Sequence, residues 1–130
     1  MNLELGADAL DDGRLARRAL EAAGGDQLVQ AAEAGPDRRE EILTPVLAEL
    51  GAWELDPRGG ADELEAAAAL CRSCGYWALP YPVAERISRP AGTGADGLVV
   101  VHGSQPAGPV AGLPLRWVAV DLDGRRSRAV

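Results

Sequence analysis

The feature that most constrains this chain is a pattern in its first 90 residues, where apolar side chains at helical spacing lead up to glycine. Glycine adopts the left-handed backbone geometry of a helix C-terminus at little steric cost, so it marks where such a segment ends. Residues 8–23 are the first example, because Gly24 and Gly25 follow them. The side chains on the apolar stripe of this segment are Leu15, Ala16, Ala19, Leu20 and Ala23. Each segment has one apolar stripe to bury, so the pattern predicts helices packed on one another.

A second helical segment follows Pro36 and ends at Gly51. Its apolar residues at helical spacing are Ile42, Leu43, Val46, Leu47 and Leu50. Pro45 interrupts this segment, because proline lacks a backbone N–H and clashes with the preceding turn. Thr44 and Pro45 suit the N-cap and the first position of a new helix, and we prefer that interpretation to a kink in one longer helix.

The third helical segment has the clearest boundaries. Asp62 at the N-cap, with Glu65 three residues later, resembles a capping box, and Gly75 provides a C-terminal stop. Its stripe is rich in small residues that let a neighbouring helix approach closely, and consists of Leu64, Ala67, Ala68, Cys71 and Cys74. A short last helix is expected near Pro82. The predicted buried face of the whole bundle includes Leu47, Leu50, Leu64, Ala68 and Cys71.

From Arg89 onward the sequence becomes rich in proline and glycine, and its periodicity changes from that of helices to that of strands. Residues 98–102 and 115–122 are strand-like. Asp123 and Gly124 form a strong hairpin signal before a return strand at residues 126–130. The change of pattern predicts a domain boundary close to residue 90.

The predicted fold is therefore mainly α, with a helical bundle in residues 1–90 and an incomplete antiparallel β segment in residues 91–130. So few strands leave open sheet edges, and they are too short to close a β-domain. We interpret the second region as the truncated start of such a domain. A fragment, a truncated reading frame and a subunit completed by a partner all fit this interpretation.

Charge and composition exclude several classes of function. The formal net charge is −7 and the pI is near 4.6, which opposes binding to the phosphate backbone of nucleic acid. No stretch approaches the roughly 20 apolar residues of a membrane helix, and the start of the chain lacks the regions of a signal peptide. We expect a cytoplasmic protein that binds neither nucleic acid nor membrane.

Two cysteines have the spacing of half a zinc site or of a redox pair. Cys71 and Cys74 lie late in an alanine-rich helical segment, and His102 is the only histidine of the chain. A structural zinc site needs four ligands, and a redox pair belongs at a strand-to-helix turn. We therefore expect buried thiols and no metal.

Two further motifs lack the context that their chemistry needs. Gly92, Gly94 and Gly97 match the spacing of a dinucleotide-binding loop, but a helical segment precedes them and a strand follows, which indicates a turn. Asp121 and Asp123 resemble part of a calcium loop without its further oxygen ligands, so the hairpin interpretation is preferred. The residues themselves predict no catalytic site.

Two runs of the sequence resemble the acyl-CoA dehydrogenase family. The first is Leu47-Ala-Glu-Leu-Gly51, followed by Pro57 and by Gly59-Gly60, and the second is residues 70–75 followed by Leu79-Pro-Tyr-Pro82. Both resemble the helix ends of that family's N-terminal domain, and the resemblance covers residues 3–90. Residues 115–124 resemble early β-domain strands of the family's divergent, actinobacterial-type members.

The resemblance implies the N-terminal portion of an FAD-dependent acyl-CoA dehydrogenase, which oxidises the Cα–Cβ bond of an acyl-CoA thioester. Its implied role is to form a wall of the acyl-CoA pocket and to pack against the remaining domains, in an oligomer. Family members place FAD and the catalytic glutamate in segments that would follow Val130, so no catalytic or cofactor-binding residue is assigned to this chain. The alternative is a non-catalytic helical module that pairs with a related dehydrogenase chain.

Overall fold

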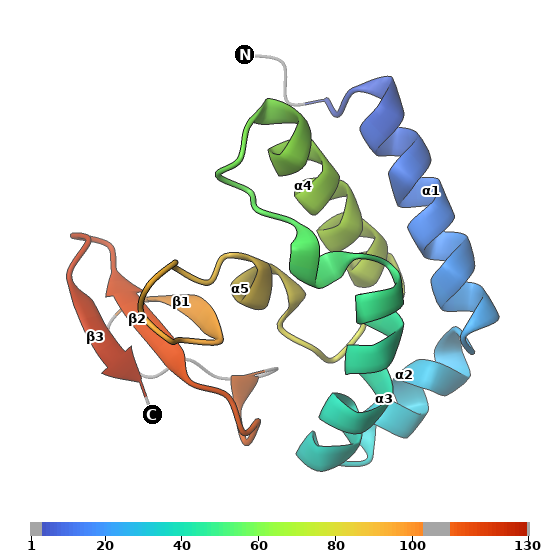
Figure 1. Ribbon diagram of the computed structural model, residues 1–130. Coiled ribbons are helices and arrows are strands. Elements are labelled where there is room, and N and C mark those ends of the chain that lie inside the picture. The colour runs from blue at the N-terminus through green and yellow to red at the C-terminus, as the bar shows by residue number, and fades with distance from the viewer. Residues whose placement is uncertain (1–3, 103–109, 130) are drawn as a thin grey trace.

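The computed structural model describes residues 4–102 and 110–129 of the chain. These residues are mainly helical, as predicted, and a small sheet follows the last helix (Figure 1). In chain order the elements are α1 (Ala7–Ala22), α2 (Asp26–Glu33), α3 (Pro36–Glu49), the short 3₁₀ helix η1 (Ala52–Glu54), α4 (Ala61–Tyr76), α5 (Val83–Ile87), β1 (Gly97–Val101), β2 (Trp117–Asp121) and β3 (Arg126–Ala129). Among the described helices, none has both the length and the apolar character needed to cross a bilayer.

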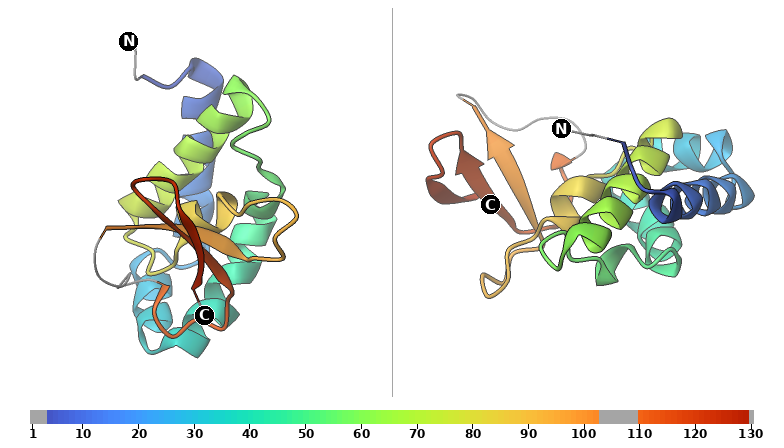
Figure 2. Two further views of the ribbon diagram at one scale, coloured as in Figure 1. Left: turned by 90° about the vertical axis from the view of Figure 1, so that its left-hand side faces the viewer. Right: turned by 90° about the horizontal axis from the view of Figure 1, so that it is seen from above.

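Helices α1 and α4 lie side by side, although about 60 residues of chain separate their contacts (Figures 1 and 2). Their shared face is built from small residues, because Gly13 and Ala16 of α1 and Ala69 of α4 are buried there. Small side chains let two helix backbones come close. The sequence prediction of a close helix neighbour for α4 is thus confirmed.

One apolar core joins residues from all five α-helices. Its fully buried leucines are Leu20 of α1 and Leu43 and Leu47 of α3, each with no exposed surface. Leu28 of α2 and Leu70 of α4 pack into the same cluster. Helix α2 was not predicted from the sequence, because its eight residues are too few to show a clear period.

Helix α3 is one continuous helix, so the predicted new start at Pro45 is wrong. Pro36 occupies its first turn, and Pro45 lies inside it. The missing N–H of Pro45 leaves the carbonyl of Glu41 without its usual helical donor. Burial of Leu43 and Leu47 on either side of Pro45 holds both halves of the helix against the core.

The start of α4 also differs from the prediction. Gly60 is the N-cap, and Asp62 lies within the first turn without a capping hydrogen bond. The carboxylate of Glu65 instead accepts a hydrogen bond from the backbone N–H of Gly6 at 2.7 Å. Gly6 is the N-cap of α1, so Glu65 satisfies a donor at the start of the neighbouring helix rather than of its own.

The end of α4 lies beyond Gly75, because the helix continues to Tyr76. The left-handed position is taken by Ala78, with φ of 53°. The N–H of Leu79 bonds to the carbonyl of Cys74 at 3.1 Å, and the N–H of Ala78 bonds to that of Gly75 at 3.0 Å. This pair of bonds is the Schellman arrangement, with alanine where glycine is usual.

Two leucines that were predicted to lie on buried stripes are exposed. Leu15 of α1 is 63% exposed and Leu64 of α4 is 54% exposed. For Leu15 the physical reason is that α1 buries a narrow stripe of small residues, so a leucine next to that stripe stays in solvent. Leu64 lies in the first turn of α4, whose buried residues begin at Ala67. The residues of α1 that are buried are Ala9, Gly13, Ala16 and Leu20. Of the predicted buried face, Leu47 is buried, while Leu50, Ala68 and Cys71 are half-buried.

The predicted antiparallel arrangement is wrong for the first two strands, because β1 and β2 pair in parallel. Gly97 stands opposite Trp117, so the chain returns to the same end of the sheet before β2 begins. A Cβ at position 97 would clash with the indole of Trp117 and lie 3.1 Å from the carbonyl of Glu85. Gly97 therefore lets Trp117 pack over β1, and α5 lies between the sheet and the other helices (Figures 1 and 2).

The predicted hairpin is confirmed, since β2 and β3 pair antiparallel with Val120 opposite Arg126. Gly124 takes φ of 80° in the turn. The carboxylate of Asp121 accepts hydrogen bonds from the backbone N–H groups of Asp123 at 3.0 Å and Arg125 at 2.8 Å. A side chain that bonds the backbone two residues on is what makes aspartate favourable in turns.

Candidate functional site

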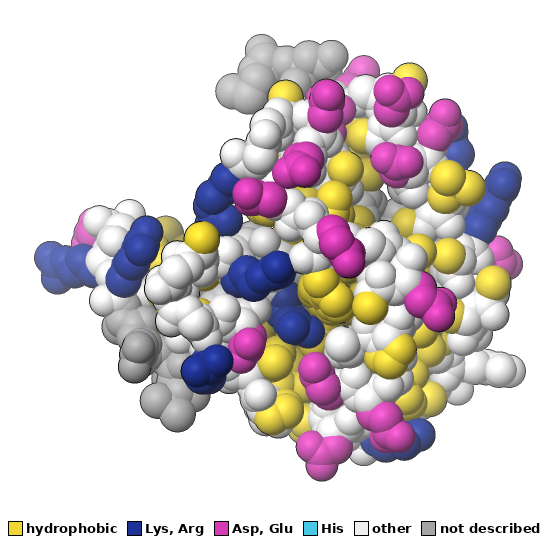
Figure 3. Space-filling view, viewed as in Figure 1, with side chains coloured by type: hydrophobic (Ala, Val, Ile, Leu, Met, Phe, Trp, Pro, Cys, Tyr) yellow, Lys and Arg dark blue, Asp and Glu magenta, His cyan; other side chains and the backbone are white. Residues whose placement is uncertain are grey.

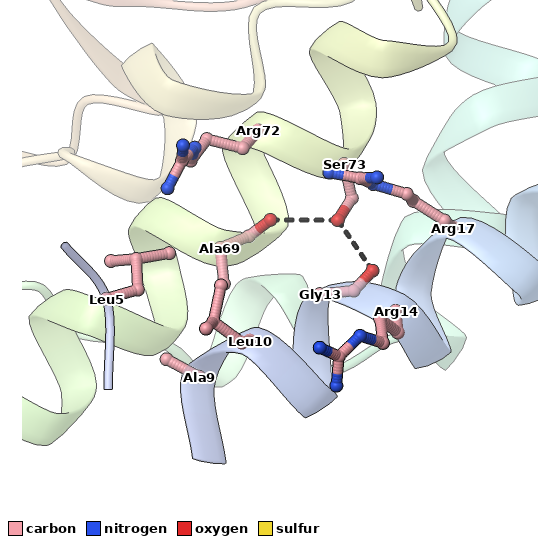
Figure 4. A pocket seen from close by; sticks show the side chains of 9 residues that line it. All are labelled: Leu5, Ala9, Leu10, Gly13, Arg14, Arg17, Ala69, Arg72 and Ser73. Atoms are coloured by element: carbon pink, nitrogen blue, oxygen red, sulfur yellow. Dashed lines mark hydrogen bonds between the residues drawn. The ribbon is translucent and has the colours of Figure 1, made fainter. Parts of the chain in front are cut away.

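A hollow of about 200 Å³ lies between α1 and α4 and has apolar and cationic parts (Figure 4). The apolar wall is formed by Leu5, Ala9 and Leu10 from the α1 side and Ala69 from α4. Leu10 is 43% exposed, so it gives the hollow an apolar surface that water can reach. This region was not predicted from the sequence, because the hollow depends on the pairing of two helices that are distant in sequence.

The base of the hollow is fixed by a buried serine. Ser73 is 1% exposed, and its hydroxyl lies 2.8 Å from the carbonyl oxygen of Gly13 and 2.9 Å from that of Ala69 (Figure 4). The contact with Gly13 links α4 to α1, and the contact with Ala69 stays within α4. The contact with Gly13 ties the two helix backbones together beneath the hollow.

Three arginines line the same hollow. The guanidinium of Arg14 forms an ion pair with Asp11 on its own helix. Arg17 extends from α1 and lies over the ring of Tyr76, 4.7 Å from the ring centroid. Arg72 makes no hydrogen bond, ion pair or ring contact with any other residue in the described parts of the chain. A local excess of positive charge thus lies beside an apolar wall, whereas Figure 3 shows many acidic side chains over the helices of the face in view.

A second polar cluster is centred on Tyr81 and is part of the core. Its hydroxyl donates to a carboxylate oxygen of Glu40 at 2.7 Å and accepts from a guanidinium nitrogen of Arg86 at 2.7 Å. The hydroxyl of Thr44 also donates to it, at 3.3 Å. Arg86 stacks over the ring of Trp53, 4.2 Å from its centroid. Burial raises the pKa of Tyr81, so this phenol stays protonated and acts as a neutral link between α3, η1 and α5.

Two buried N–H groups near this cluster have no hydrogen-bond partner among the described residues. They are the Nε of Arg86 and the indole nitrogen of Trp53. Neither residue lines the hollow between α1 and α4 or the larger one described below. We therefore assign the cluster a structural role.

Both cysteines are free thiols in α4, with Cys74 buried and Cys71 half-buried. Burial raises the pKa of Cys74 to about 12, and it also raises the pKa of Cys71. A thiol with a raised pKa is a poor nucleophile and a poor metal ligand at neutral pH. Within residues 4–102 and 110–129, no group of three or more histidine, cysteine or acidic side chains is placed to hold a metal ion. The expectation of no metal stays a prediction.

The predicted turn motif lies between α5 and β1, as expected. Gly92 and Gly94 have positive φ and line a hollow of about 380 Å³. Two arginines line it as well, but their side chains are tied to the backbone: Arg58 donates to the carbonyl of Ser88 at 3.0 Å, and Arg89 to that of Trp53 at 2.9 Å. Since those hydrogen bonds hold part of each guanidinium against the backbone, this hollow is the weaker candidate for binding.

The sequence carried only a partial signal for the hollow between α1 and α4. Arg14 and Arg17 are three residues apart and so share a helix face with Leu10 and Gly13. Both arginines are exposed. Nothing in the local sequence indicates that Arg72, about 60 residues later, lines the same hollow. Comparison of the chain with protein-family models, with curated proteins and with solved structures found no match.

Proposed function

We propose that the chain is the N-terminal portion of an FAD-dependent acyl-CoA dehydrogenase, in which it forms a wall of the acyl-CoA pocket and packs against the remaining domains. In this proposal the protein is cytoplasmic and oligomeric, and FAD and the catalytic glutamate come from parts outside this chain. The observation that carries the proposal is the place of the two sequence runs that resemble the family. Both lie at helix ends, where the chain turns from one helix into the next.

The first run ends α3, where Gly51 takes φ of 74° and its N–H bonds to the carbonyl of Ala48 at 3.0 Å. The second run leaves α4 and enters α5, and its Leu79, Tyr81 and Pro82 are buried. These residues set the angle between successive helices, because buried turns leave the chain few alternative paths. The order of helix, turn and helix supports the resemblance on which the proposal rests.

The alternative is a non-catalytic helical module that pairs with a related dehydrogenase chain. Both proposals require that another part of a protein packs against this chain. The sheet is consistent with that requirement, because within the described residues the outer edges of β1 and β3 are unpaired. Val100 is 63% exposed and Leu122 is 70% exposed. Open edges and exposed apolar side chains are features that a further strand or a partner would cover.

The test starts with the purified 130-residue chain and then uses the protein isolated from its native cells through an N-terminal tag. Hydride transfer needs a flavin held against the substrate and a base opposite it, so the chain alone should neither retain FAD nor reduce an electron acceptor with acyl-CoA. The tagged native protein should carry flavin absorbance and acyl-CoA-dependent reduction of the acceptor. One longer tagged chain would support the first proposal, and a separable flavin-bearing partner would support the alternative.

A matched pair of substitutions tests the role of the sheet in that assembly. Val100→Arg should release the flavin-bearing part, whereas Leu15→Arg should not, although both side chains are 63% exposed. Circular dichroism of each variant should match the unsubstituted chain, which shows that the helices are intact. A tagged native protein with neither flavin nor acyl-CoA-dependent activity would contradict both proposals.

A further inference from the structure

We propose that the hollow between α1 and α4 binds a small carboxylate with a short alkyl chain. This inference is independent of the proposed function, because it rests on the residues of the hollow and requires neither flavin nor a partner. Its basis is the combination of an apolar wall, a rigid base and three guanidinium groups within one hollow.

The apolar wall determines the alkyl part of the ligand. The side chains of Leu5, Ala9, Leu10 and Ala69 are all hydrocarbon, and Leu10 is left 43% exposed. Contact with an alkyl chain would remove this surface from water, which favours binding. A purely polar anion such as inorganic phosphate would leave that surface uncovered.

The arginines determine the charge of the ligand. A guanidinium presents paired N–H donors that match the two oxygens of a carboxylate. Arg72 has no partner among the described residues, so its donors need not be taken from another group. The guanidinium carbon of Arg17 lies over the ring of Tyr76, and a contact with a ring face uses none of the lone-pair acceptors that its N–H groups would bind. Arg14 shares its charge with Asp11, so we expect it to contribute less.

The volume limits the size of the ligand. At about 30 Å³ for each water-sized group, 200 Å³ holds about six or seven non-hydrogen atoms. A short fatty acid fits this limit if its carboxylate lies at the rim near Arg72. Most of a nucleotide or of a long acyl chain would lie outside the hollow. The bonds of Ser73 at the base keep the hollow from deepening without a loss of helix contacts.

The experiment is an NMR titration of the full chain with hexanoate, using hexanol and inorganic phosphate as the two partial probes. Hexanoate should cause saturable shifts of the amides of Gly13 and Ser73. Hexanol has the alkyl chain without the charge, and phosphate has the charge without the alkyl chain, so both should bind at least about tenfold more weakly. Saturable hexanoate shifts that avoid both residues, or no saturable shifts, would overturn the proposal.

Substitutions at the hollow have matched controls on α1. Arg72→Gln should weaken hexanoate binding by about tenfold or more, and Leu10→Ser should weaken it as well. Arg18→Gln and Leu15→Ser should leave the Kd unchanged, because these exposed residues do not line the hollow. All four side chains are exposed, so the fold should survive, and the unperturbed amide spectrum checks this.

Other outcomes have definite meanings. Equal binding of hexanol, with no effect of Arg72→Gln, would show an apolar hollow without carboxylate recognition and would refute the proposal. Equal binding of phosphate would refute the role of the alkyl chain. If Arg72→Gln disturbs the fold, Arg72→Lys keeps the charge but loses the paired donors, and it should bind hexanoate with intermediate strength. None of these readouts depends on flavin or dehydrogenase activity, so failure here and failure of the proposed function remain distinguishable.

Discussion

Replacing Ala78 by glycine should stabilise the protein. Ala78 follows α4 with φ of 53°, and it is the only non-glycine residue with positive φ in the described parts of the chain. A side chain in this left-handed geometry crowds its own backbone, whereas glycine has no Cβ to do so. The side chain of Ala78 is exposed, so its removal costs little apolar burial. The two hydrogen bonds that end α4 use backbone atoms only and should persist.

The size of the effect follows from two opposing terms. Relief of the left-handed strain contributes about 1–2 kcal/mol to the free energy of unfolding. Glycine also gains freedom in the unfolded chain, which lowers the stability by about 0.4–1 kcal/mol. We therefore expect a net increase of about 0.5–1 kcal/mol, or about 2–4 °C in Tm for a chain of this size.

Urea unfolding followed by tryptophan fluorescence measures this change, since Trp77 precedes Ala78 directly. Ala48→Gly is the matched control, because Ala48 is an exposed residue inside α3 with ordinary helical geometry. The same chemical change there should destabilise the protein by about 1 kcal/mol. If Ala78→Gly lowers the stability as Ala48→Gly does, the reasoning from backbone strain is wrong.

Three further predictions follow from the core and the helix interface. Leu47→Ala should lower the free energy of unfolding by about 2–5 kcal/mol in urea, because Leu47 is fully buried, while Leu64→Ala should change it by less than about 0.5 kcal/mol. Gly13→Ala should raise the stability by about 0.5–1 kcal/mol, since a Cβ there would meet Ser73 and Ala69 at ordinary contact distances of 3.5–3.7 Å; a loss would show that the helices cannot accept a methyl group. Because burial raises the pKa of Cys74 from 9.0 to about 12, its contribution to stability is full below pH 9 and is lost as the pH rises towards 12. Thermal unfolding between these pH values should therefore show a smaller decline for Cys74→Ala than for the unsubstituted chain, and equal declines would contradict the assignment.

Local sequence signals predicted the helix ends that depend on glycine alone. Gly24 and Gly51 lie where α1 and α3 stop, and both have positive φ. The hairpin turn at Asp123 and Gly124 was predicted for the same reason, because its geometry needs no distant residue. Such features depend on a few adjacent residues, and the sequence displays those directly.

Features that depend on distant residues were missed or misread. Glu65 looked like part of a capping box for its own helix, but it caps α1, because the two helix starts lie together. Pro45 looked like a new helix start, but core contacts of Leu43 and Leu47 keep α3 continuous. The parallel pairing of β1 and β2 could not be read from the strands, since alternation along a strand does not specify its partner's direction.

The candidate site also combines features that adjacent residues reveal with features that depend on distant residues. Arg14 and Arg17 are visible in the sequence as arginines at helical spacing, but nothing local indicates that Arg72 belongs with them. The apolar wall was hidden for a further reason, because Leu10 was not on the predicted stripe of α1. A binding hollow between two helices becomes predictable only when their pairing is known.

The pairing of α1 with α4 has a consequence for how the chain folds. The bonds from Gly6 to Glu65, from Ser73 to Gly13 and from Trp77 to Arg17 each join residues 59 or 60 positions apart. Closing a loop of that length costs about 3.6 kcal/mol in chain entropy, which is comparable to the net contribution of about 1.5–4.5 kcal/mol from three hydrogen bonds together. The two helices therefore gain little by meeting before α2 and α3 have brought them together, and α1 should acquire its amide protection from hydrogen exchange together with α4 rather than ahead of it.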